Sequence, residues 1–135
     1  MSKQEDLDRW HLLKKQIDSR LPSDIPRFRV KEVWLCHLGK NVGHEENGSG
    51  GDFLRPILIV RKFNKNLFIG IPLSSQIKDS VFYYPLGEVR ETEAAAILSQ
   101  TRPVSSKRLK WKMHTLSDSE FEAAKKAARE RLFGS

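Results

Sequence analysis

The sequence predicts an α+β fold: a small, strongly bent β-barrel with a helix near each end of the chain. Apolar residues recur at three- and four-residue steps near both termini, which is typical of helices that bury one face. Between them lie about five short segments with strand-like patterns, separated by turn-forming residues. The 135 residues, 39% of them hydrophobic, suffice for one compact domain and a short appendage.

The N-terminal segment, residues 1–27, is expected to form an amphipathic helix and a proline-containing linker. Pro22 and Pro26 end the helical pattern and stiffen the connection to the rest of the chain. We therefore divide the chain into this segment and a barrel domain, residues 28–135. We expect the helix to pack on the barrel or across a dimer through an apolar stripe formed by Leu7, Trp10, Leu13 and Ile17.

The strands of the barrel are predicted from alternating or fully apolar runs. Asn64 to Asn66 marks a turn between two of them, and the Arg61-Lys62 pair is expected to end the strand before it. The stretch 39–53, rich in Gly, Asn and charge, is predicted to be an exposed flexible loop, because ordering it costs entropy and buries little. The predicted strands are residues 28–35, 56–60, 67–73, 81–89 and 94–98.

The C-terminal helix carries the clearest local signals. Ser117 and Glu120 have capping-box spacing, and Leu116 and Phe121 have the spacing of a hydrophobic staple. Gly134 suits the end of the helix. The apolar stripe of this helix consists of Phe121, Ala124, Ala128 and Leu132.

Charge and cysteine content restrict the function classes. The net charge is +7 and the pI is about 9.7; residues 28–135 carry +6 of that charge. Such a surface is either simply solvated or attracts a polyanion such as nucleic acid. Cys36 is the only cysteine, which excludes an intrachain disulfide and a Cys-rich metal site. Because no apolar run is long enough to span a bilayer, we expect a cytoplasmic protein without membrane contact.

Four motifs in the barrel region resemble, in order, those of MazF/PemK toxins. The first is Gly43-His-Glu-Glu46, followed by a Gly-rich stretch and Arg55-Pro-Ile-Leu-Ile-Val60. The next is Ile71-Pro-Leu-Ser-Ser-Gln76, which matches the Pro-x-Thr/Ser-x-Gln strand end of that family. Gln100-Thr-Arg102 and Ser106-Lys-Arg-Leu109 complete the set, and the resemblance covers about residues 29–132.

The resemblance implies an SH3-like barrel of the CcdB–MazF type and a homodimer with single-stranded RNA in a groove. It also implies a cognate antitoxin that blocks this groove. The implied activity is that of a metal-independent endoribonuclease. In this reaction the ribose 2′-OH attacks the adjacent phosphate, and the products carry 2′,3′-cyclic phosphate and 5′-OH ends.

Because the nucleophile belongs to the substrate, the protein must supply proton transfer and stabilisation of the crowded phosphorane. Arg55 is the first candidate, since a guanidinium fork suits a phosphate better than a lysine does. Ser74 matches the catalytic Thr/Ser of the family. His44 and Glu45 match loop residues that contribute to the site in PemK-like and MazF-like members, respectively.

Further polar residues are expected to line the RNA groove, although each could equally be a structural hydrogen-bonding group. They are Ser75, Gln76, Gln100 and Arg102.

Two observations restrict the reaction mechanism that we expect. One is a departure from the family pattern, and the other is an arrangement of Cys and His that is unsuited to binding a metal. PemK-like members carry a catalytic Arg and Asp where this chain has Ile97 and Ser99, so activity should follow the MazF-like scheme. No cofactor and no metal are expected: Cys36 and His37 are adjacent and would point to opposite faces of a strand.

Two other functions remain open on the sequence. A barrel of this type poisons DNA gyrase in the CcdB group, but the end of this chain, Arg131 to Ser135, lacks the aromatic-Gly-aliphatic tail of that group. The chain could also be a paralogue that binds RNA or an antitoxin without cutting. Retention of Arg55 and Ser74 argues against that alternative.

Overall fold

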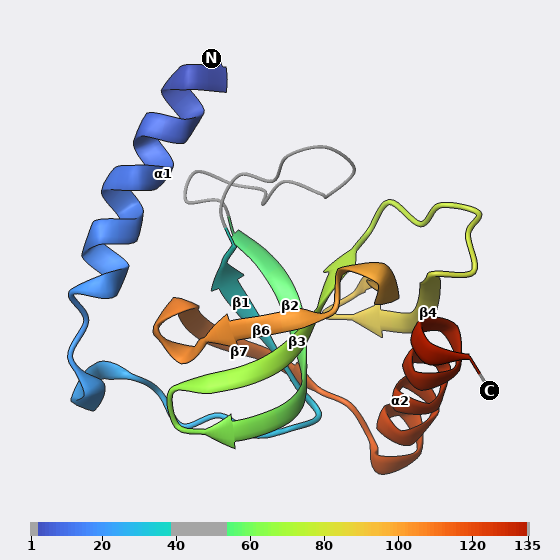
Figure 1. Cartoon of the computed structure of the whole chain (residues 1–135). Helices are drawn as coiled ribbons and strands as arrows, with labels where there is room; N and C mark the ends of the chain where they lie inside the picture. Colours follow the sequence, from blue (N-terminus) through green and yellow to red (C-terminus); the bar gives the residue numbers. More distant parts are fainter. Residues whose placement is uncertain (1–2, 39–53, 135) are drawn as a thin grey trace.

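The computed structural model, which describes residues 3–38 and 54–134, has the predicted α+β architecture. A single curled antiparallel sheet forms a half-barrel, and the two helices lie on opposite sides of it (Figure 1). The predicted flexible loop, residues 39–53, lies outside the described residues.

The two helices are α1 (Lys3–Asp18) and α2 (Asp118–Phe133), and the short 3-10 turns are η1 (Pro22–Asp24), η2 (Leu98–Gln100) and η3 (Ser106–Arg108). The strands are β1 (Glu32–His37), β2 (Leu54–Asn64), β3 (Leu67–Ser74), β4 (Tyr83–Val89), β5 (Thr92–Ile97), β6 (Arg102–Ser105) and β7 (Leu109–Thr115). The order across the sheet is β4-β5-β3-β2-β1-β7, and β6 pairs with the other part of β3.

Two predictions about the strands were wrong. The pair Arg61-Lys62 does not end β2, because the hairpin to β3 continues pairing as far as Asn64 opposite Leu67. The strands β6 and β7 were not predicted at all. Their sequences, RPVS and LKWKMHT, have few apolar residues, and they become strands by pairing with β3 and β1.

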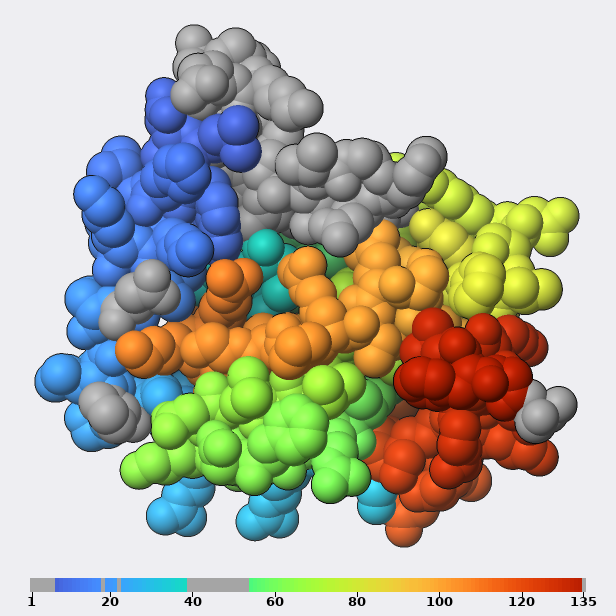
Figure 2. Space-filling view, viewed as in Figure 1, coloured from blue at the N-terminus to red at the C-terminus, as the bar shows by residue number. Residues whose placement is uncertain are grey.

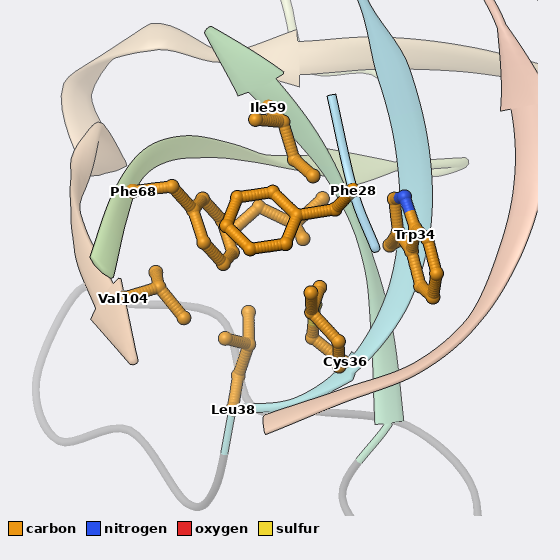
Figure 3. Close-up of a cluster of buried hydrophobic side chains, with 9 residues drawn as sticks. Phe28, Trp34, Cys36, Leu38, Ile59, Phe68 and Val104 are labelled. Carbon is orange, nitrogen blue, oxygen red and sulfur yellow. The ribbon is translucent and has the colours of Figure 1, made fainter. Parts of the chain in front are cut away.

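One hydrophobic core fills the inside of the curled sheet (Figure 3). The rings of Phe28 and Phe68 meet at its centre, 5.3 Å apart between centroids. Phe28 precedes β1, so the segment that connects α1 to the sheet takes part in the core. The other buried members are Trp34, Cys36, Leu38, Ile57, Ile59, Val104 and Leu109.

A second core lies between the other face of the sheet and α2. Leu58 and Leu73 contribute from the sheet, and Phe121 and Ala124 from the helix. The predicted capping box is confirmed: the Ser117 side chain accepts from the Glu120 amide, and the Glu120 carboxylate accepts from the Ser117 amide. The cap therefore fixes where α2 starts on the sheet.

Removal of this cap should destabilise the protein measurably. Ser117→Ala is expected to lower the free energy of unfolding by about 1 kcal/mol, because it deprives the Glu120 amide of its acceptor. Urea denaturation measures this loss. Ser119→Ala, which removes a nearby exposed hydroxyl but keeps the cap, should cost much less. An equal loss in both variants would contradict the role of the cap.

The contribution of Glu120 should also depend on pH. Hydrogen bonds from the Ser117 backbone amide and side chain lower the pKa of Glu120. A carboxylate with a lowered folded-state pKa stabilises the fold above the ordinary carboxyl range, about pH 4, and this stability disappears as the pH falls through the lowered value. The difference in stability between the native protein and Glu120→Gln should therefore shrink on acidification. A difference that is constant with pH would contradict this.

Candidate functional site

Arg55 and Ser74 lie close together where β2 begins and β3 ends. The register of the β2–β3 pair places Ile57 opposite Pro72, and Arg55 and Ser74 come two positions further along each strand. Residues directly opposite in an antiparallel pair project to the same face. The Nη1 atom of Arg55 donates a hydrogen bond of 2.9 Å to the Leu73 carbonyl, next to Ser74. The structure therefore brings together the two residues that the sequence singled out first.

Both side chains are largely buried, since each is only 7% exposed. A guanidinium stays protonated in proteins, so Arg55 places a fixed positive charge where solvent screening is weak. Charge–charge interactions with an anion at this position would be stronger than at an exposed surface. The pair is thus suited to stabilising negative charge.

A turn after β3 fixes the hydroxyl of Ser74. Its Oγ accepts a hydrogen bond of 3.1 Å from the Gln76 amide, and it lies 3.3 Å from the Gln76 carbonyl. Ser75 and Gln76 are exposed in this turn, directly beside the buried pair. Ser74 and Ser75 also line a pocket of about 200 Å³ that extends towards β4, β5 and β7.

Arg102 and Gln100 approach the same region from another element. Arg102 begins β6 and pairs with Gly70 of β3, and Gln100 ends η2 just before it. Phe68 and Val104, a neighbouring pair, point into the inner core, so the alternation of the strands directs Arg102 to the inner face as well. Both Gln100 and Arg102 are half-buried.

Cys36 lies at the centre of this arrangement. It is fully buried and pairs with Arg55 across β1 and β2. Burial raises the pKa of the Cys36 thiol far above its ordinary value, and the charges of Arg108 and Arg102 oppose that shift. The thiol is therefore protonated and unsuited to nucleophilic attack.

Contacts that α1 and Arg20, just after it, make with the segment around η3 were not predicted. The Nη1 atom of Arg20 donates to the carbonyls of Lys107 and Leu109, and the Arg108 guanidinium lies 5.4 Å from the centre of the Trp10 ring. In the space-filling view, α1 (blue) borders the atoms of this segment (orange) (Figure 2). No local pattern could have revealed these contacts, because they join distant parts of the chain.

Two of the predicted catalytic residues, His44 and Glu45, lie outside the described residues. Within 3–38 and 54–134, no group of three or more His, Cys, Asp or Glu residues could hold a metal ion. Neither helix in the described part of the chain is long and apolar enough to cross a membrane.

A larger cavity than the one beside Ser74, about 640 Å³, lies elsewhere. It is bordered by the outer face of β2 and β3 and by α2, with Val60, Ile71 and Ala128 among its lining residues. Neither Arg55 nor Ser74 lines it. We place the candidate site at the Arg55–Ser74 pair, because the charged and polar groups converge there.

A family model for the PemK-like, MazF-like toxins of type II toxin-antitoxin systems matches residues 29–132. The chain belongs to this family. The match includes all seven strands, Arg55, Ser74, Gln100 and Arg102, and leaves α1 outside. No curated protein sequence matches the chain.

Solved structures of MazF toxins have the same fold. An endoribonuclease in complex with its cognate antitoxin, from a mycobacterial species, superimposes with a TM-score of 0.60 and 12% identity, over 78% of this chain and 95% of that one. The Mycobacterium tuberculosis toxin MazF-mt6 superimposes with a TM-score of 0.57 and 13% identity, over 75% of this chain and 95% of that one. The MazE-MazF structure from Deinococcus radiodurans superimposes with a TM-score of 0.56 and 14% identity, over 82% of this chain and 98% of that one. These similarities establish the MazF fold for this chain.

The burial of Cys36 predicts an unreactive thiol. In the native MazF-like toxin at mildly alkaline pH, a thiol reagent should label Cys36 far more slowly than it labels a free thiol, because the site is both protonated and inaccessible. Unfolding in denaturant should restore the ordinary rate. The labelling rate with and without denaturant measures this, and rapid labelling of the native protein would contradict the described packing.

Proposed function

We propose that this chain is the toxin of a type II toxin-antitoxin pair and acts as a metal-independent endoribonuclease on single-stranded RNA. The observation that carries the proposal is the placement of Arg55 beside Ser74 at the end of the β2–β3 pair, where Arg55 Nη1 donates to the Leu73 carbonyl. Cleavage by a ribose hydroxyl requires positioning and charge stabilisation rather than a protein nucleophile. The pair supplies groups for both tasks.

In the proposed reaction, the ribose 2′ oxygen attacks the adjacent phosphorus as its proton is removed, and the bond to the 5′ oxygen breaks as that oxygen gains a proton. Arg55 neutralises the charge that accumulates on the phosphoryl oxygens, and Ser74 donates a hydrogen bond to one of them. We assign the two proton transfers to His44 and Glu45 on the family resemblance alone. The products carry 2′,3′-cyclic phosphate and 5′-OH ends.

The surrounding polar residues are assigned to RNA binding. Gln76 and Ser75 are exposed beside Ser74, while Gln100 and Arg102 come from the neighbouring strand and turn. The excess positive charge of the chain favours contact with a polyanion. This arrangement would hold RNA on the side of the sheet where the Arg55–Ser74 pair reaches the surface.

Two protein partners complete the proposal. One similar structure is an endoribonuclease in complex with its cognate antitoxin, and another pairs MazE with MazF. By extension, we propose that a cognate antitoxin binds this chain and blocks its site. We also propose a homodimer with RNA bound across it, as the family resemblance implies.

The activity is tested with the pure protein, a mixed-sequence RNA and EDTA. Cleavage that leaves cyclic-phosphate ends is expected, and Arg55→Ala should reduce kcat by about 100- to 1000-fold, as removal of a key charge-stabilising donor does. Arg55→Lys should recover little, because it lacks the planar fork. Ser74→Ala should also lower kcat.

Arg61→Ala is the matched control, because Arg61 is exposed on the same strand but far from Ser74. Its activity should stay close to that of the native protein. Intact RNA combined with inhibition of DNA supercoiling would instead indicate a gyrase poison. RNA binding without cleavage would indicate a non-catalytic paralogue.

A further inference from the structure

We infer that Arg108 forms a second phosphate-binding position beside the Arg55–Ser74 pair, and that α1 holds it there. The ligand would be the backbone phosphate of a neighbouring nucleotide in the same RNA strand. The inference rests on the proposed RNA-cleaving function. It gives a role to a helix that the family match does not include.

The end of α1 is fixed against the barrel by one residue of the apolar stripe and one arginine. Ile17 is the buried residue of the stripe, at 7% exposure. The Ser19 and Arg20 amides donate to the Lys15 and Ile17 carbonyls, both at 3.1 Å, so the chain direction is set as it leaves the helix. The structure therefore directs the Arg20 side chain towards η3 from an ordered helix end.

Arg20 clamps the backbone on both sides of Arg108. Its Nη1 atom donates to the Lys107 carbonyl and to the Leu109 carbonyl, at 2.8 Å each. These two carbonyls flank Arg108 in the sequence, so one guanidinium fixes the backbone from which Arg108 projects. Part-buried charge-assisted hydrogen bonds of this length are among the stronger ones in proteins.

The same helix also contacts the Arg108 side chain. The Trp10 ring lies 5.4 Å from the Arg108 guanidinium, within cation–π distance. Trp10 is half-buried, two helical turns before Ile17. Two contacts thus converge on one residue: Arg20, just after the end of α1, holds the backbone on both sides of Arg108, and Trp10 of α1 contacts its guanidinium. A long side chain held in this way loses less entropy when it binds an anion.

Strand pairing brings Arg108 close to the candidate site. Leu109, the next residue, pairs with Cys36, and Cys36 pairs with Arg55. Two strand spacings, about 10 Å, therefore separate the start of β7 from Arg55. Arg108 and Arg102 both act electrostatically on Cys36. Three arginines thus lie near Cys36, and the repulsion between their charges favours a bound polyanion there.

The test compares Arg108→Met with Arg61→Met. Arg61 is exposed on β2, where it borders the cavity between the outer face of the sheet and α2, and its replacement removes the same charge. Cleavage of a mixed-sequence RNA pool gives KM and kcat, and the anisotropy of labelled 2′-O-methyl RNA, which cannot be cleaved by this route, gives affinity at several salt concentrations.

Arg108→Met should raise KM about tenfold with kcat nearly unchanged. It should also reduce the slope of log affinity against log salt by about 0.7, the value for one phosphate contact on a single strand. Arg61→Met should leave both KM and the salt slope close to their native values. Trp10→Ala should raise KM in the same direction and Trp10→Phe should restore it, since a ring is what contacts the charge.

If Arg108→Met proves to be unfolded by circular dichroism, the Trp10 pair and Arg108→Lys decide the question; the lysine variant should keep the salt slope. If the native protein cleaves RNA but substitution of Arg108 or Trp10 changes neither KM nor the salt slope, this inference is overturned and the proposed function stands. If the native protein neither cleaves nor binds RNA, both this inference and the proposed function are overturned.

Discussion

The register between β2 and β3 is the constraint on which the candidate site depends. Side chains alternate between the two faces of a strand, so a slip of one residue would move every inward side chain outward. The inward set on β2 includes Ile57 and Ile59, which are fully buried, and their core partner Phe68 comes from β3. Burial of these apolar side chains fixes the register, and the alternation of the strands beyond the Ile57–Pro72 pair places Arg55 and Ser74 on the same face. The polar pair is thus positioned by a hydrophobic core that it does not itself fill.

The curvature of the sheet explains why charged residues collect at one end. The inner core and the core beneath α2 cover the two faces of the central strands, and both are made of apolar side chains. On β2 and β3 themselves, the inward positions beyond Ile57 and Pro72 are occupied by Arg55 and Ser74 instead of apolar side chains. A buried cation needs hydrogen-bonding partners, and the carbonyl at the end of β3 supplies one. Arg55 and Ser74 therefore occupy inward positions at the ends of β2 and β3, beside the inner core.

Local sequence signals made part of the fold and part of the candidate site predictable. The fold class, the start of α2 and the two leading site residues were predicted from capping patterns, apolar runs and motif order, and the structure confirms the first two and brings the site residues together. The strands β6 and β7 were missed because pairing partners, rather than their own apolar content, make them strands. The Arg20 clamp joins residues 87 positions apart, a separation that periodicity and spacing do not encode.

The attachment of α1 to the barrel depends less on hydrophobic contact than its apolar stripe predicted. Its apolar stripe predicted docking through hydrophobic contact, yet only Ile17 is buried, while Leu7, Trp10 and Leu13 are half-buried. Hydrogen bonds from Arg20 and the ring contact of Trp10 supply the other links to the barrel. An element with few buried apolar contacts opens at a lower free energy than the core does. Because these links attach to η3 and the start of β7, the docked position of α1 depends on the barrel, whereas both cores of the sheet are built without residues of α1.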